Sequence, residues 1–365
     1  MTRLRVLLVT DAVGGVWIYS LELARALKPL GIETLLAVMG PSPTRAQRDE
    51  AADFELIDTA LPLEWLDTTP QEIVSAGRAL ARMAKSEGVD IIQTSSAALL
   101  AGADMALPSV AVQHSCLASW WAAVKRTSCP AEFDWRRQLV GQGLANASAI
   151  VAPSLAFAAE TSRIYDVPVA CVHNGRRSRP ARDVPPAEFV FTAGRLWDEG
   201  KNIAALDRAA RRLHVPVQAA GPCEGPNGTR INLAHVEALG TLGDTRLSAI
   251  YGARPLYVSP ALYEPFGLSV LEAAQAGCAL LLSDIPTHRE IWSGAAIFVP
   301  PQDDRAIAAA ITALLNDPLE RDQMGQCARA RAQHFRPERM ARGMAGIYAS
   351  MAAPVKAPAE MAGAA

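Results

Sequence analysis

The chain has 365 residues, of which 50 % are apolar and 20 % are charged, and its formal net charge is −2. This length suffices for two domains that each bury a core. The nearly balanced charge gives no reason to expect nucleic acid or a membrane surface as a partner.

The cysteines and the lengths of the apolar runs indicate the cellular compartment in which the protein works. The six cysteines are scattered, with no Cys-x-x-Cys pair and no Cys/His cluster at zinc spacing, so we expect free thiols in a reducing cytosol. The first apolar run breaks at Asp11 and is too short for a signal peptide. No run approaches the ~20 apolar residues of a spanning helix. We therefore expect a cytoplasmic protein.

Short apolar runs alternate with helical patterns through the first half of the chain. Continuous apolar runs are typical of parallel strands buried on both faces. We predict strands over 4–10, 34–38, 55–57, 89–93, 110–112, 149–151 and 169–172, and helices over 17–27, 71–86, 97–105 and 154–165. This alternation predicts a doubly wound α/β domain over residues 1–180.

Two features of this half have both a structural and a functional interpretation. Gly14 and Gly15 lie between the first strand and the first helix, an arrangement that cradles phosphates but also serves ordinary tight turns. His114 follows the strand at 110–112, on the ligand side of a parallel sheet. A lone histidine is more often structural than catalytic, so both interpretations stay open.

An aromatic and basic segment follows, with Trp120, Trp121, Lys125 and Arg126. Aromatic faces stack on sugars, and cations bind phosphate or carboxylate, so one interpretation is an acceptor site. The other is a helical hairpin packed through its tryptophans.

The middle of the chain is expected to join two domains. Asn174 and Gly175 form a turn dipeptide. Residues 176–186 then contain three prolines and four arginines, which indicates an interdomain linker. We expect these arginines, Arg176, Arg177, Arg179 and Arg182, to be solvated.

The second half repeats the alternation. We predict strands over 188–193, 217–220, 236–239, 255–259 and 279–283, a short helix within 284–292, and helices over 203–213, 244–251 with Asp244 as the cap, 268–277, 303–315 and 319–335. This pattern predicts a second α/β domain over 187–335. A last helix over 336–352 and a disordered tail over 353–365 complete the chain.

Two strand–loop–helix junctions of the second half carry chemistry. Arg195 and Lys201 follow the strand at 188–193, where a guanidinium and an ammonium group can bind a negatively charged ligand without a metal. At the second junction, free amides near Gly267 open a helix, and Glu264 and Glu272 bracket them. Carboxylates do not bind phosphates, so hydroxyl groups of a ligand are their natural partners. The alternative is a capped helix with an acidic first turn.

These motifs resemble those of a known family. The stretch from Tyr263, Tyr-Glu-Pro-Phe-Gly-Leu-Ser-Val-Leu-Glu-Ala, is similar to the Glu-x7-Glu signature of glycosyltransferase family 4. Gly194-Arg195-Leu with Lys201 resembles its second signature, although many relatives have Lys-Gly where this chain has Gly-Lys. The resemblance implies the α/β GT-B fold: two Rossmann-like doubly wound domains that face an interdomain cleft, with a C-terminal helix crossing back to the first domain.

The resemblance also implies a function, that of a retaining, metal-independent glycosyltransferase (hexosyltransferase-type). It would move a sugar from a UDP- or GDP-linked donor to a glycan, lipid or small-molecule acceptor by front-face attack. It assigns catalysis to Glu264 and His114, diphosphate binding to Arg195, Lys201, Gly267 and Leu268, nucleoside binding to Glu272, Leu239 and Gly240, and the cleft loops to Gly14, Gly15 and Asn174.

No metal site and no cofactor are expected, because Asp-x-Asp does not occur and the nucleotide sugar is a substrate. The alternatives on the same fold are a sugar-nucleotide epimerase, a phosphorylase and a non-catalytic nucleotide-sugar binding protein. An epimerase needs a pair of carboxylates in the first domain, and we identify none. The sequence leaves open the acceptor, the sugar, the base, the oligomeric state and peripheral membrane association.

Overall fold

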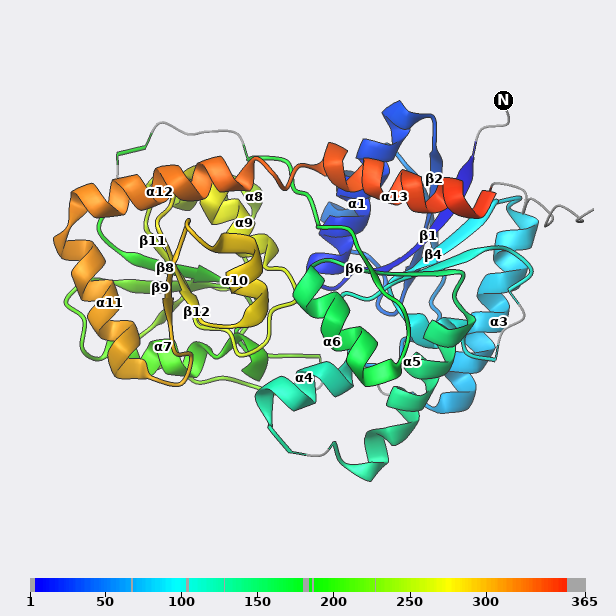
Figure 1. Cartoon of the computed structure of the whole chain (residues 1–365), viewed down its shortest axis with the longest axis horizontal. Helices are drawn as coiled ribbons and strands as arrows, with labels where there is room; N and C mark the ends of the chain where they lie inside the picture. The colour runs from blue at the N-terminus through cyan, green and yellow to red at the C-terminus, as the bar shows by residue number, and fades with distance from the viewer. Residues whose placement is uncertain are drawn as a thin grey trace, which may run out of the picture.

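A computed structural model describes residues 4–66, 68–102, 105–127, 129–179, 184, 185, 187–226 and 228–352. It shows two lobes side by side, each built around a parallel sheet (Figure 1). The predicted tail at 353–365 and Arg182 lie outside the described residues.

The N-terminal domain surrounds a seven-stranded sheet in the order β3-β2-β1-β4-β5-β6-β7. Its elements are β1 Arg5–Asp11, α1 Gly15–Leu27, η1 Lys28–Leu30, β2 Glu33–Met39, α2 Arg45–Glu50, β3 Glu55–Asp58, α3 Pro70–Ser86, β4 Ile91–Thr94, η2 Ala97–Leu100, β5 Ser109–Val112, α4 Leu117–Val124, η3 Ala131–Phe133, α5 Asp134–Asn146, β6 Ala149–Ala152, α6 Leu155–Tyr165 and β7 Ala170–Cys171.

The C-terminal domain surrounds a six-stranded sheet in the order β10-β9-β8-β11-β12-β13. Its elements are β8 Val190–Ala193, η4 Glu199–Lys201, α7 Ile203–Ala210, β9 Val217–Ala220, β10 Glu237–Ala238, α8 Asp244–Gly252, β11 Leu256–Ser259, α9 Leu268–Ala276, β12 Leu280–Ser283, α10 Pro286–Trp292, β13 Ile297–Val299, α11 Asp304–Asn316 and α12 Pro318–Ala332, followed by α13 Pro337–Ala352. In both sheets the order reverses beside the first strand, as in dinucleotide-binding folds, which confirms the predicted fold class.

The apolar strands are buried on both faces, as expected for parallel sheets. In β1, Leu7 and Val9 belong to one core cluster, while Val6 and Leu8 belong to the cluster on the other face. Successive side chains of a strand point to opposite faces, so one continuous apolar run serves two cores.

The last helix, α13, crosses from the C-terminal domain to the N-terminal domain and lies along α1 (Figure 1). Met340, Met344 and Tyr348 recur every fourth residue and are buried in the core cluster that also contains residues of α1. The Tyr348 hydroxyl donates to Gln93 Oε1 at 2.5 Å. The predicted crossing helix is therefore confirmed, and its apolar face is what holds it there.

Three local predictions were wrong. The helix expected over 97–105 is only the short η2, because Ala101 is extended and Gly102 has a left-handed φ of 64°. Asp244 does not cap α8, since it is the first helical residue and its Oδ1 pairs with Arg179 at 2.5 Å. Strand β13 was missed altogether.

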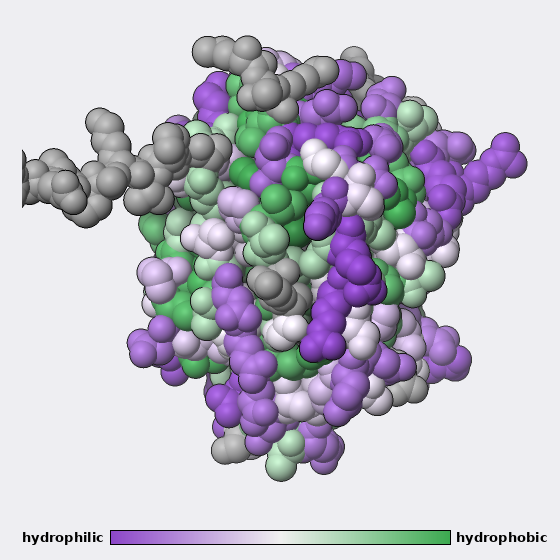
Figure 2. Space-filling view, turned by 90° about the vertical axis from the view of Figure 1, so that its right-hand side faces the viewer, coloured by the Kyte–Doolittle hydropathy of each residue, from purple (hydrophilic) through white to green (hydrophobic). Residues whose placement is uncertain are grey.

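Every helix among the described residues is too short or too polar to span a bilayer. Figure 2 shows the end face of the N-terminal domain, where apolar areas are broken up by hydrophilic side chains.

Candidate functional site

The two predicted diphosphate-binding elements lie opposite the loop that follows β1. A Cβ atom built on Gly14 would lie 4.0 Å from Arg195 Nη1, and one built on Gly15 would lie 3.5 Å from Leu268 Cδ1. The loop after β1 in one domain and the loops after β8 and β11 in the other therefore face each other, at the carboxyl ends of the strands where α/β sheets bind ligands.

Glu264 and Lys201 form a buried ion pair at the centre of this region. Lys201 Nζ lies 2.5 Å from Glu264 Oε2, and the Glu264 and Lys201 side chains are 9 % and 19 % exposed. Burial alone would raise the pKa of Glu264, but the attraction of the Lys201 ammonium and its hydrogen bond lower it below the usual value. Glu264 is therefore ionised at neutral pH.

Arg195 is held by a second carboxylate. Its Nη2 lies 2.9 Å from Asp198 Oδ2, while Asp198 Oδ1 accepts from the Gly200 amide at 2.9 Å and from Trp120 Nε1 at 3.0 Å. Burial raises the pKa of Asp198, but Arg195, Lys201 and these hydrogen bonds outweigh it, and the net pKa is lowered. The result is a fixed, charged loop that orients Arg195.

The loop that carries Glu264 is hydrogen-bonded to both domains. The Tyr263 hydroxyl hydrogen-bonds with Ser119 Oγ at 2.8 Å, and Ser154 Oγ donates to the Pro265 carbonyl at 2.8 Å. From its own domain, Thr287 Oγ1 donates to the Glu264 carbonyl at 2.6 Å. Glu264 is thus placed by contacts on both sides of the interdomain seam.

Helix α9 begins with an uncapped first turn. Gly267 occupies the N-cap with φ 88° and ψ 67°, a left-handed conformation that favours glycine, and it has no side chain to accept the first amides. Gly267 and Leu268 therefore offer a helix N-terminus that is suited to an anion.

Glu272 is not open to solvent. Arg176 Nε lies 2.9 Å from its Oε1 and Arg179 Nη2 lies 3.2 Å from its Oε2. Arg176 Nη1 also pairs with Glu22 Oε1 of α1 at 2.9 Å. Our expectation of a solvated linker was therefore wrong for Arg176 and Arg179, because buried carboxylates from both domains need these cations. Arg177, which is 57 % exposed, pairs with Glu22 Oε2 at 3.2 Å.

His114 lies in the N-terminal domain, with its ring 4.4 Å from that of Tyr19 in an edge arrangement. Its Nε2 is buried and has no hydrogen-bond partner among the described residues. Burial lowers the pKa of His114 to about 4, so the ring is neutral at physiological pH.

The structure adds two carboxylates that we did not predict. Asp11 ends β1, and its Oδ1 accepts from the Val13 amide at 2.7 Å. Burial raises the pKa of Asp11 to about 6, although the Val13 amide and Arg195 oppose it. Glu64 accepts from Ser96 Oγ at 2.5 Å, and its burial raises its pKa. The position of Asp11, directly after a buried strand, was a signal in the sequence, whereas Glu64 had none.

Part of the predicted acceptor segment contacts the other domain. Trp120 donates to Asp198, and Lys125 Nζ lies 2.6 Å from Glu199 Oε2. Trp121 lines a cavity of about 330 Å³, together with Ala118 and Arg137 among others. Some of these side chains therefore pack against the other domain, while Trp121 lines a cavity. A role of the segment in acceptor binding stays a prediction.

Three further predicted residues, Asn174, Leu239 and Gly240, make contacts elsewhere in the chain. Asn174 is buried beside Gly175, on which a Cβ would collide with the Arg336 carbonyl, so this turn packs under the junction of α12 and α13. Leu239 and Gly240 follow β10, and their backbone groups bond to Ala219 and Gly221. The structure leaves their assigned roles as predictions.

Two protein families match the sequence. Residues 13–177 match Glycosyltransferase Family 4, and residues 229–331 match Glycosyl transferases group 1. Over 176 residues the chain is 31 % identical to a glycogen synthase of Mycobacterium tuberculosis, which covers 45 % of this chain and 42 % of the relative. Over 100 residues it is 32 % identical to O-antigen chain mannosyltransferase B of Escherichia coli, which covers 27 % of this chain and 26 % of the relative. The chain thus matches less than half the length of these curated relatives.

Solved structures share the fold across almost the whole chain. Sucrose-phosphate synthase from Thermosynechococcus elongatus has a TM-score of 0.76 at 20 % identity and covers 95 % of this chain and 99 % of its own. Anabaena Alr3699/HepE in complex with UDP-glucose has a TM-score of 0.72 at 16 % identity, with 95 % and 99 % covered. At these identities the likeness establishes the architecture alone.

The raised pKa of Asp11 predicts a pH-dependent stability. The folded protein binds the Asp11 proton more tightly than the unfolded chain, whose pKa is 3.8, so this stabilisation is complete below pH 3.8 and is lost as the pH rises through about 6. Asp11→Asn removes the ionisation, and we expect its stability relative to wild type to grow between these pH values by up to about 3 kcal/mol, from 1.36 kcal/mol per pKa unit. Urea unfolding across this range measures the gain.

Asp53→Asn, at an exposed position of the same domain, is the matched control. Parallel stability curves for wild type and Asp11→Asn over the whole range would contradict the assignment.

Proposed function

The chain belongs to glycosyltransferase family 4 and has the GT-B fold, and on this premise we propose that it transfers a sugar from a nucleoside-diphosphate donor with retention of configuration and without a metal at the diphosphate. The proposal rests on the Lys201–Glu264 ion pair and on Arg195 beside it. Together they place two cations and one ionised carboxylate near the N-terminus of α9.

Each charge has a task in this reaction. As the glycosidic bond breaks, negative charge grows on the diphosphate, and Arg195, Lys201 and the amides of Gly267 and Leu268 stabilise it. Positive charge grows at the anomeric carbon, and the Glu264 carboxylate stabilises that. A leaving phosphate oxygen takes the acceptor proton as the acceptor attacks from the same face. Fixed groups of opposite sign replace a metal ion in this scheme.

His114 contributes from the opposite domain. Because its ring is neutral, it donates one hydrogen bond to a donor-sugar hydroxyl without adding a positive charge near the anomeric carbon. Its buried Nε2, which has no hydrogen-bond partner in the part of the chain that the structure describes, supports the assignment of this atom to a ligand.

The names of the relatives suggest candidates for the sugar, the base and the acceptor. Alr3699/HepE is described in complex with UDP-glucose, and other relatives are named a glycogen synthase and a mannosyltransferase. We propose a UDP- or GDP-linked hexose as the donor and a hydroxyl of a growing glycan as the acceptor.

One observation supports the epimerase alternative. Asp11 and Glu64 are carboxylates of the N-terminal domain whose pKa values are raised mainly by burial, and the charge of Glu64 raises the pKa of Asp11 further. Such carboxylates can act as an acid and base pair. Incubation of the donor without an acceptor separates the two functions, since an epimerase converts the sugar nucleotide while a transferase leaves its sugar configuration unchanged.

Glu264→Gln tests the proposed transfer. The substitution keeps the side-chain shape but removes the charge that stabilises the anomeric carbon, so we expect kcat to fall by about 100-fold or more. Nucleoside-diphosphate affinity should be unchanged or higher, because Lys201 loses its competing carboxylate. Turnover assays and calorimetric titration with UDP and GDP measure the two quantities.

Glu320→Gln on the exposed start of α12 is the matched control and should leave both quantities unchanged. An equal loss of turnover and nucleotide affinity in Glu264→Gln would sink the assignment.

Glu272 is tested through the ribose that it is proposed to bind. If its carboxylate accepts hydrogen bonds from the ribose hydroxyls, a 2′,3′-dideoxynucleoside diphosphate should bind wild type about 10-fold more weakly than the parent nucleotide. In Glu272→Gln the difference between the two nucleotides should shrink. An unchanged difference in the variant would show that Glu272 serves only Arg176 and Arg179.

A further inference from the structure

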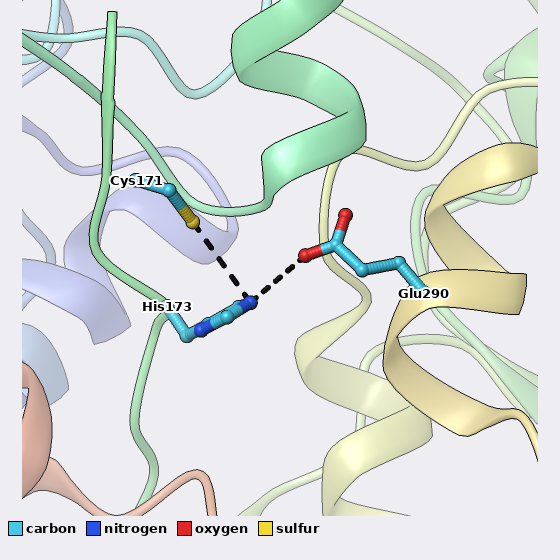
Figure 3. A group of neighbouring side chains, drawn as sticks. All are labelled: Cys171, His173 and Glu290. Carbon is cyan, nitrogen blue, oxygen red and sulfur yellow. Dashed lines mark hydrogen bonds and ion pairs between the residues drawn. The ribbon is translucent and has the colours of Figure 1, made fainter.

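Three metal-ligating side chains, none of them part of the Lys201–Glu264 pair, meet across the interface between the domains. They are Cys171 at the end of β7, His173 just after it, and Glu290 on α10 (Figure 3). His173 Nε2 lies 2.9 Å from Glu290 Oε1 and 3.9 Å from Cys171 Sγ. One ligand atom of each residue lies within 4.8 Å of the other two.

We propose that Cys171, His173 and Glu290 bind a Zn²⁺ ion that bridges the two domains. Bond lengths of about 2.3 Å to sulfur and 2.0–2.2 Å to nitrogen and oxygen in a tetrahedron require ligand atoms about 3.4–3.6 Å apart. The nitrogen and oxygen are closer than this, and the sulfur and nitrogen slightly farther. Side-chain shifts of a few tenths of an ångström bring these two distances into this range, and the sulfur and the carboxylate oxygen lie within 4.8 Å of each other.

The donor set and its surroundings suit zinc. A thiolate, an imidazole and a carboxylate together favour a borderline ion over Mg²⁺ or Ca²⁺, which prefer oxygen. The Leu155 amide donates to Glu290 Oε1 at 2.8 Å and the Ala156 amide to Oε2 at 2.7 Å. These second contacts hold the carboxylate toward His173, as outer hydrogen bonds do in metal sites.

The fourth ligand has room. A pocket of about 210 Å³ adjoins Cys171 and His173, and its other polar lining residues are His334, Arg336 and Arg339. Water in this pocket can complete the tetrahedron, which is the arrangement of a zinc site with three protein ligands.

Zinc binding must release a proton. A cysteine thiol is ordinarily protonated at neutral pH, whereas zinc binds the thiolate. The sulfur–zinc bond forms as the sulfur–hydrogen bond breaks, and the proton leaves to solvent. Affinity therefore rises with pH, because fewer protons compete for the sulfur.

A bound ion would link the interface between the domains to the proposed donor site through helix α10. Glu290 lies on α10, the helix from which Thr287 holds the Glu264 carbonyl. Cys171 and His173 belong to the N-terminal domain, so the ion fixes this helix against that domain. The diphosphate ligands are separate, and the proposed transfer remains free of a metal at its reacting atoms.

Titration of the chelator-stripped full chain with Co²⁺ and Zn²⁺ tests this inference. We expect one ion per chain, a thiolate-to-cobalt charge-transfer band that Zn²⁺ abolishes, and release of the Cys171 proton, seen as a dependence of the binding heat on the buffer. Substoichiometric binding, or cobalt binding without the thiolate band, would overturn the proposal.

Variants assign the ligands. Cys171→Ser should abolish the thiolate band, and both it and His173→Ala should lower Zn²⁺ affinity by at least about 10-fold. Cys327→Ser and His214→Ala, at exposed positions elsewhere, are the matched controls and should bind as wild type does. Circular dichroism verifies folding, and wild-type affinity in both ligand variants would overturn the assignment.

Discussion

An ionised carboxylate that lies between two domains and out of water needs a cation, and Glu264 obtains one from Lys201 at 2.5 Å. The pair joins the loop after β8 to the loop after β11. Tyr263 and Pro265, on either side of Glu264, are held by hydroxyl groups of the N-terminal domain. The position of the charge at the proposed reaction centre therefore depends on the contact between the domains as well as on the fold of either one.

Several polar contacts cross the interface between the domains. Arg176 joins Glu22 of α1 to Glu272 of α9, and Glu290 joins α10 to His173 and to the N-terminus of α6. Such contacts depend on local charge, and a ligand that brings its own charges or hydroxyl groups can replace them. A nucleotide at Glu272 and a zinc ion at Glu290 would each change one part of this seam, which links binding to the relative position of the domains.

Local signals in the sequence were enough for the fold and for part of the site. Strand, loop and helix follow each other in the chain, so the neighbourhood of Gly267 and Arg195 was predictable. The pairing of Arg176 with Glu272 was not, because these residues are 96 positions apart and meet only through packing of the domains. The same holds for Cys171 and Glu290, which have no common motif. Short-range patterns identify the strand ends, whereas the contacts across the seam need the three-dimensional structure.

The most direct test of the donor-site account is ligand-induced stabilisation measured with a chelator present. UDP, GDP, ADP and TDP are compared with their parent nucleosides in thermal unfolding. We predict that one diphosphate at 100 times its Kd stabilises the protein by about 2.7 kcal/mol without a divalent metal, and that its nucleoside does not. Stabilisation by none of the four diphosphates, or only after a divalent metal is added, would contradict it.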